Sequence, residues 1–93
     1  MRLTEAQKLN ALNAITSALL QGRITFRDAY SVANEAAGFR PLDTRSPCYR
    51  LADQFLQSLR RKDFAFPSRS GNTWFWALTD AGRAALAQED SDE

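Results

Sequence analysis

The sequence predicts an α+β fold that is mostly helical, with three helices, a β-hairpin and a short C-terminal helix. Two observations support this prediction. In three segments before residue 63, apolar residues recur at spacings of three and four, which is the repeat of an amphipathic helix. Between residues 64 and 78, large apolar residues instead recur at every second position on both sides of a Gly/Asn/Ser segment, which is typical of two strands joined by a turn.

The first helix is expected from about Glu5 to Gln21. Thr4 followed by Gln7 fits a capping box, in which each side chain bonds the backbone N–H of the other residue. Gly22 is suited to end the helix in a left-handed conformation. The expected apolar stripe consists of Leu9, Leu12, Ile15, Ala18 and Leu19.

The second helix is expected to follow after a very short extended piece at Arg23-Ile24. Thr25 is the predicted N-cap, and Asp28 lies in the first turn, where a negative charge is favourable. Gly38 is expected to stop this helix after Ala37. Its inner face consists mainly of small residues, which allow close packing: Phe26, Ala29, Tyr30, Ala33 and Ala37.

The third helix is expected from about Pro47 to Lys62, after a turn-rich loop from Phe39 to Arg45. Ser46 fits the N-cap, and proline at the next position loses no hydrogen bond there. The apolar stripe consists of Cys48, Leu51, Ala52, Phe55, Leu56 and Leu59. We expect Cys48 to be a buried, inert thiol, and we expect burial against the first helix and the hairpin for Leu51, Phe55 and Leu59.

A β-hairpin is expected next, because Phe64 and Phe66 alternate, as do Trp74, Trp76 and Leu78. The predicted loop covers Ser68 to Asn72 and places Arg69 at the tip. Phe75 must point to the opposite face from its neighbours, and a covered Phe75 would indicate a dimer or partner surface. Thr79 can cap a last helix through about Gln88, although Gly82 weakens its first turn.

Length and composition exclude several classes of function. The chain has 93 residues, enough for one compact domain, and its 44% hydrophobic and 25% charged content is that of an ordinary globular domain. No apolar run approaches the roughly 18 residues of a membrane span, and a signal-peptide pattern is missing, so we expect a cytoplasmic protein without a membrane partner. With no His and one Cys, we expect no metal, no cofactor and no catalytic triad.

Charge is uneven along the chain. Four of the 11 acidic residues lie in the last five positions, which leaves 12 basic against seven acidic residues in the remainder. We expect residues 1–88 to form one domain and residues 89–93 to be a flexible acidic tail. A modestly basic body suits a nucleic-acid binder, although it suits many other proteins too.

The order of elements, together with the phrase Leu78-Thr79-Asp80-Ala81-Gly82-Arg83 after the second strand, resembles a winged helix-turn-helix domain. The resemblance covers nearly the whole chain, and the phrase is similar to those of bacterial winged-helix regulators. It implies that the third helix enters a DNA major groove and that the wing reaches the backbone or minor groove. The connection from Gly38 to Arg45 is longer than a three- or four-residue turn, so the placement of the second and third helices stays open.

Our first hypothesis is a sequence-specific double-stranded DNA-binding protein, a small bacterial or phage transcriptional regulator with no enzymatic activity. A homodimer is expected, because one such unit covers only part of a typical operator. Base contacts are expected from one polar helix face, and phosphate contacts from basic residues around it. The base-contacting residues are Arg50, Gln54 and Gln57, with Tyr49 in support, and the phosphate-contacting residues are Arg45, Arg61, Lys62 and Arg69, with Ser46 at the helix N-terminus.

The rival hypothesis is a protein-interaction module of the same fold, such as a small inhibitor or adaptor that binds a larger nucleic-acid-processing complex. A net charge of only +1 favours this rival, because dedicated DNA binders are often strongly basic. On the rival hypothesis, the polar face of the third helix is simply solvated. An enzyme ranks third, since no residues form a candidate catalytic constellation.

Overall fold

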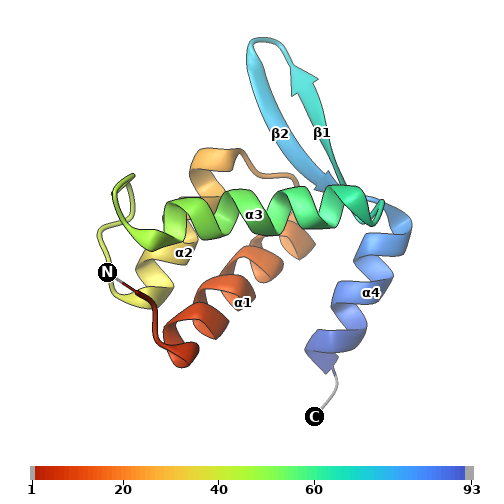
Figure 1. The fold of residues 1–93 in the computed structure, drawn as a ribbon. Helices are drawn as coiled ribbons and strands as arrows, with labels where there is room; N and C mark the ends of the chain where they lie inside the picture. The colour runs from red at the N-terminus through yellow and green to blue at the C-terminus, as the bar shows by residue number, and fades with distance from the viewer. Residues whose placement is uncertain (1, 92–93) are drawn as a thin grey trace.

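A computed structural model of the chain describes residues 2–91. Figure 1 shows the N-terminal helices packed together, a hairpin that projects from the C-terminal end of the last of them, and the C-terminal helix beside the first. The elements are α1 (Glu5–Gln21), α2 (Phe26–Ala37), α3 (Pro47–Arg61), β1 (Ala65–Ser70), β2 (Thr73–Leu78) and α4 (Asp80–Ser91).

Capping hydrogen bonds fix the starts of α1 and α2. Thr4 Oγ1 accepts from the Gln7 backbone N–H at 3.0 Å, and Gln7 Oε1 accepts from the Thr4 N–H at 2.9 Å. Thr25 and Asp28 form the same reciprocal pair. Gly38, in the left-handed region with φ 91°, ends α2. Gly22 ends α1 in an extended conformation with φ 161°, so the left-handed conformation expected there was wrong. Local sequence signals therefore predicted the bounds of both helices correctly.

The core lies where α1, α2 and α3 meet. Ala11, Ile15 and Leu19 of α1 are fully buried in it. Leu9, which we expected in this stripe, is 58% exposed, because it lies about 120° around the helix from Ile15. Three of the five buried residues of α2 are alanine, so its backbone can approach its neighbours closely.

The buried stripe of α3 is rotated slightly from the predicted one. Leu59 is buried as expected, whereas Leu51 and Phe55 are only half-buried at the edge of the stripe. Lys62 caps the helix instead of belonging to it. The residues at the centre of the stripe are Cys48, Ala52, Leu56 and Leu59.

The hairpin turn is shorter than predicted. β1 continues to Ser70, which pairs with Thr73, so Gly71 and Asn72 alone form the turn. Gly71 has φ 63°, as the first central residue of a type II′ turn requires. The predicted loop from Ser68 was therefore wrong, and Arg69 lies within β1 rather than at the tip.

A short bridge attaches the hairpin to the helices. The Ile24 N–H donates to the Trp76 carbonyl at 3.0 Å, and the Trp76 N–H donates back at 2.6 Å. The Arg23 guanidinium lies 4.4 Å from the centre of the Phe75 ring, which is half-buried. Phe75 is thus covered by the same chain, and its partial burial needs no dimer or partner surface.

The start of α4 packs directly against the chain just before β1. Thr79 caps the helix by accepting from the Gly82 N–H at 3.0 Å, and its hydroxyl donates to the Asp63 carbonyl at 2.6 Å. A Cβ atom on Gly82 would lie 1.9 Å from the Phe64 carbonyl oxygen. α4 continues to Ser91, beyond the predicted end at Gln88. Residues 92–93 of the predicted tail lie outside the described residues, and its flexibility stays a prediction.

We predict that Gly82→Ala destabilises the protein. In a helix, glycine to alanine normally stabilises by up to about 1 kcal/mol, but here the methyl group meets backbone that cannot rotate away. We expect a loss of about 1 to 3 kcal/mol in the free energy of unfolding, measured by denaturant titration.

Gly22→Ala is the matched control, because a Cβ atom there meets nothing within 4 Å. It should change the stability by no more than about 0.5 kcal/mol. If Gly82→Ala lowered the free energy of unfolding no more than Gly22→Ala does, α4 would not pack this closely against Phe64.

Candidate nucleic-acid interface

Asn34 on α2 sets the path of the chain into α3. Its side chain is fully buried, and its Nδ2 donates to the carbonyls of Pro41 and Asp43, both at 3.0 Å. Its Oδ1 accepts a hydrogen bond from the Ser46 hydroxyl. One amide therefore holds both the middle and the end of the long connection, and this places α3 relative to α2.

Ser46 is a positioning residue in this arrangement. It is 7% exposed, and its Oγ also accepts from the Cys48 N–H at 3.2 Å, as an N-cap does. Its single hydroxyl donor is therefore already engaged and is not available to a phosphate oxygen. Arg45 comes directly before Ser46. The Arg45 backbone N–H donates to Asp43 Oδ1 at 2.8 Å, and the Arg45 side chain is exposed.

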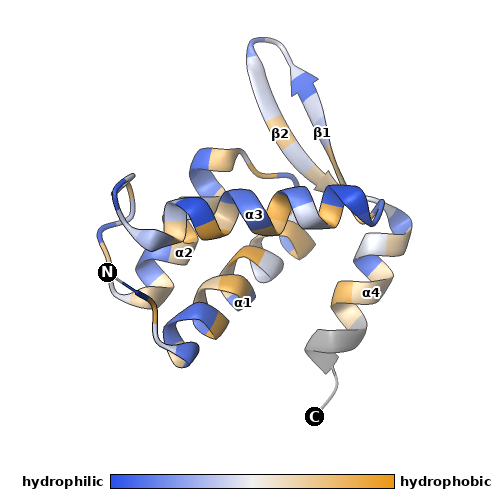
Figure 2. Ribbon diagram, in the orientation of Figure 1, coloured by the Kyte–Doolittle hydropathy of each residue, from blue (hydrophilic) through white to orange (hydrophobic). Residues whose placement is uncertain are grey.

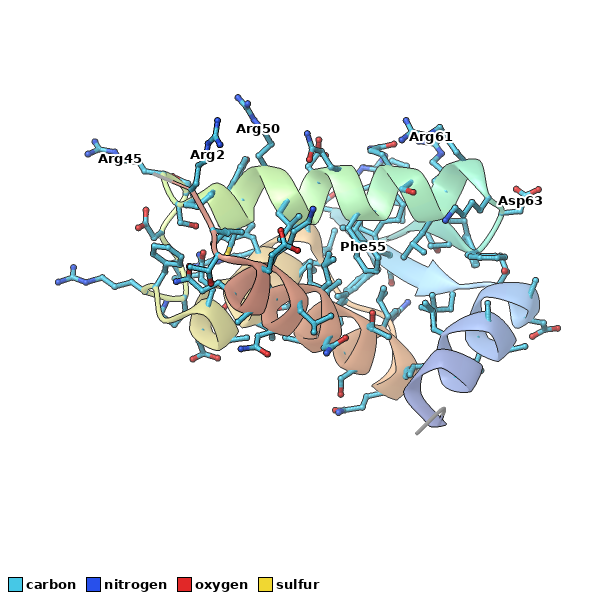
Figure 3. The ribbon with its side chains drawn as sticks, turned by 60° about the horizontal axis from the view of Figure 1, so that its bottom comes forward. Arg2, Arg45, Arg50, Phe55, Arg61 and Asp63 are labelled. Atoms are coloured by element: carbon cyan, nitrogen blue, oxygen red, sulfur yellow. The ribbon has the colours of Figure 1, made fainter. Side chains whose placement is uncertain are left out.

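The outer face of α3 is polar and accessible. Figure 2 shows hydrophilic residues along the outer turns of α3 and hydrophobic residues on the side toward α1. Gln57 is half-buried. Figure 3 shows Arg50 and Arg61 pointing outward from the same side of α3, and Arg45 extending past the N-terminal end of the helix. The exposed side chains of this group are Arg45, Arg50, Gln54, Arg61 and Lys62.

Tyr49 faces another direction from the polar residues. Its ring lies 5.1 Å from the ring of Phe26 and 4.9 Å from that of Tyr30, measured between centroids. The three rings form a small aromatic cluster between α2 and α3, and Tyr49 remains 37% exposed. Its first role is therefore to hold the start of α3 against α2.

On the hairpin, Arg69 stands directly across from Trp74. Arg69 is exposed, and its Nε donates to the Gly71 carbonyl at 2.9 Å, which turns the side chain toward the tip. Trp74 is 58% exposed, and Phe66 on the opposite face is 45% exposed. The hairpin thus exposes a cation and the Trp74 ring near its tip, and the Phe66 ring near its base on the opposite face.

Two basic residues that sequence reasoning did not select lie beside α3. A groove of about 600 Å³ separates the N-terminal segment from the start of α3, and Arg2 and Lys8 line it together with Arg45 and Arg50. No local pattern marks Arg2 or Lys8 as functional, because only the packing of α1 brings them to this place.

Other kinds of site have little support. Cys48 is fully buried, and burial raises the pKa of its thiol, an effect partly offset by a hydrogen bond with Ser46. Within residues 2–91, no group of three or more His, Cys, Asp or Glu side chains could hold a metal ion. None of the described helices combines the length and apolar character that crossing a membrane requires.

Comparison with known proteins identifies the fold. No family model and no curated protein matches the chain. A point mutant of ZitR from Lactococcus lactis superposes with a TM-score of 0.56 at 17% identity, over 98% of this chain and 53% of that one. A fragment of Mb0332 from Mycobacterium bovis superposes with a TM-score of 0.55 at 18% identity, over 91% of this chain and 73% of that one.

The Mb0332 fragment is described as a homodimeric winged helix-turn-helix DNA-binding domain of a possible ArsR-family transcriptional regulator. The present chain spans about half the length of ZitR. At 17% and 18% identity, the likeness to these two proteins shows a shared fold and nothing about function. The chain therefore has the winged-helix fold, in which α1, α2 and α3 form the helical part and β1–β2 form the wing.

We predict that Asn34→Ala costs about 2 to 4 kcal/mol of stability. The change leaves the Pro41 and Asp43 carbonyls and the Ser46 hydroxyl without their partner. Asn13→Ala, at an exposed position of α1, is the control and should be neutral or slightly stabilising. Thermal unfolding followed by circular dichroism compares the two, and similar midpoints would contradict the organising role of Asn34.

We predict that Cys48 reacts slowly with an aromatic disulfide reagent at pH 8 in the folded protein and rapidly in concentrated guanidinium chloride. Burial raises the thiol pKa in the folded state, so the thiolate is scarce there. The same shift means that stability is unaffected well below the usual thiol pKa of about 8.5 and falls as the pH rises above it. Equal reaction rates in both states would show that Cys48 is accessible.

Proposed function

We propose that this chain is a sequence-specific double-stranded DNA-binding protein that acts as a transcriptional regulator in the cytoplasm of a bacterium or in phage infection. The observation that carries the proposal is the outer face of α3. It is a rigid helix with exposed Arg and Gln side chains pointing away from the core, in the position of a recognition helix. The proposal requires no covalent chemistry.

The expected contacts divide into two kinds. Arg50 and Gln54 can form bidentate hydrogen bonds with guanine and adenine edges, and the half-buried Gln57 has less reach. Basic side chains at both ends of α3 and on the wing would bind phosphates, which positions the helix without reading sequence. Those side chains are Arg45, Arg61, Lys62 and Arg69, and Ser46 contributes by fixing the start of α3.

A homodimer forms part of the proposal. One wing and one helix contact only a few base pairs, and a two-fold dimer would read two half-sites about one helical turn apart. The homodimeric state of the Mb0332 domain supports this arrangement for a chain of the same fold.

A second candidate function is a protein-binding module, such as an inhibitor or adaptor on a nucleic-acid-processing complex. The specific observation in its favour is the wing, where Trp74 and Phe66 expose large apolar surface on opposite faces. Salt separates the two functions, because phosphate contacts weaken steeply with salt whereas an apolar interface changes little.

We predict that Arg50→Ala and Arg69→Ala impair DNA binding in different ways. Arg50→Ala should cost about 1 to 3 kcal/mol on the preferred site and blur its sequence preference. Arg69→Ala should weaken binding to all sequences alike and make the salt dependence shallower by about one unit. Fluorescence anisotropy on a preferred duplex and a randomised pool, at several salt concentrations, measures both effects.

Wild-type protein that binds no duplex more tightly than the randomised pool would contradict the proposal. In that case, variants Trp74→Ser and Phe66→Ser should be tested for loss of a protein partner. Unchanged sequence preference in Arg50→Ala would show that α3 does not read bases at this position.

A further inference from the structure

The groove between the N-terminal segment and α3 concentrates positive charge. Four basic side chains line it, from Arg2, Lys8, Arg45 and Arg50, with Glu5 as the single acidic residue. The whole chain, by contrast, has 12 basic and 11 acidic residues. The near-neutral net charge therefore conceals a local positive potential beside the start of α3.

The N-terminal segment is held in place by packing and hydrogen bonds. Leu3 packs against the hydrophobic core, and Thr4 is fixed by its capping box with Gln7. The Gln7 Nε2 also donates to the Ala37 carbonyl at 3.0 Å, which ties α1 to the end of α2. Arg2 therefore extends from an anchored point, and it needs little ordering when a ligand binds.

Arg2 joins the arginines of α3 on one side of the molecule. Figure 3 shows Arg2 between Arg45 and Arg50, with Arg2 and Arg50 directed outward and Arg45 extending past the N-terminal end of α3. All three line the same groove, although they come from two segments far apart in the sequence. Guanidinium groups bind phosphate oxygens in a bidentate manner, and a row of them matches a chain of phosphates better than a single small anion.

We propose that Arg2 and Lys8 bind the phosphate backbone of DNA along the N-terminal end of α3, which makes the N-terminal segment a second clamp opposite the wing. This inference rests on the proposed function and deepens it. The wing grips the duplex beyond one end of α3, and Arg2 with Lys8 grips it at the other end. Their contacts add affinity and register and carry no sequence information. Glu5 limits the positive potential of the groove.

The test is the double variant Arg2→Gln/Lys8→Gln in the full chain. Its matched control is Arg83→Gln, which removes an exposed cationic side chain from α4, away from the groove, together with the hydrogen bond from Arg83 to the Leu20 carbonyl. Anisotropy titrations use a preferred duplex and a randomised pool over a range of salt, and circular dichroism confirms that each variant is folded.

We expect the double variant to bind both the preferred duplex and the pool about 5- to 30-fold more weakly at low salt, with an unchanged ratio between them. Its salt dependence should be shallower by up to about two units, because two phosphate contacts are lost. Arg2→Lys retains the charge and should recover most of the affinity lost on changing Arg2. Arg83→Gln should stay close to wild type.

Two results would overturn the inference. One is a folded double variant that binds DNA no more weakly than Arg83→Gln, while the wild type binds a preferred site. The other is a pair of observations: inorganic phosphate alone saturates the wild type at low millimolar concentration, and the double variant loses no DNA affinity. Together they would make the groove a site for a small anion. Wild-type protein without sequence preference contradicts the proposed function instead, so the two failures are distinguishable.

Discussion

The hydrogen bonds of Asn34 are the constraint on which the arrangement of α3 depends. A buried amide in an otherwise apolar stripe is costly unless its donors and acceptor are satisfied, and here the two loop carbonyls and the Ser46 hydroxyl satisfy them. The long connection between α2 and α3 thereby acquires a defined path. Because Ser46 also caps α3, the same network sets where the helix begins and which face it exposes.

The wing depends on a second set of contacts at the opposite end of α3. An isolated two-stranded hairpin is marginally stable in water, so its attachment matters. Two backbone hydrogen bonds between Ile24 and Trp76 join a third extended segment to β2, and Arg23 covers Phe75. Behind the hairpin, the close approach of Gly82 to Phe64 seats α4. Helix and wing are thus positioned by separate contacts, and a change in one need not displace the other.

The distribution of charge bears on both candidate functions. The net charge of +1 favours a protein partner over DNA, because dedicated DNA binders are often strongly basic. The folded chain places exposed arginines of the N-terminal segment and of α3 on one side, so a local field suited to phosphate coexists with a nearly neutral whole. DNA binding through α3 and the N-terminal segment gives no role to the exposed aromatic residues of the wing.

The sequence by itself determined the number and order of the elements, the helix starts at Thr4, Thr25 and Ser46, and the polar outer face of α3, because capping and periodicity act over a few residues. It misplaced the hairpin turn, since Ser68 and Arg69 have little strand preference and only pairing with β2 makes them a strand. Tertiary structure alone decided the partners of Asn34 and the position of Arg2 along the same groove as Arg50. The partners of Asn34 lie across an irregular loop, and Arg2 is far from Arg50 in the chain, so no helical or strand repeat in the sequence predicts either arrangement.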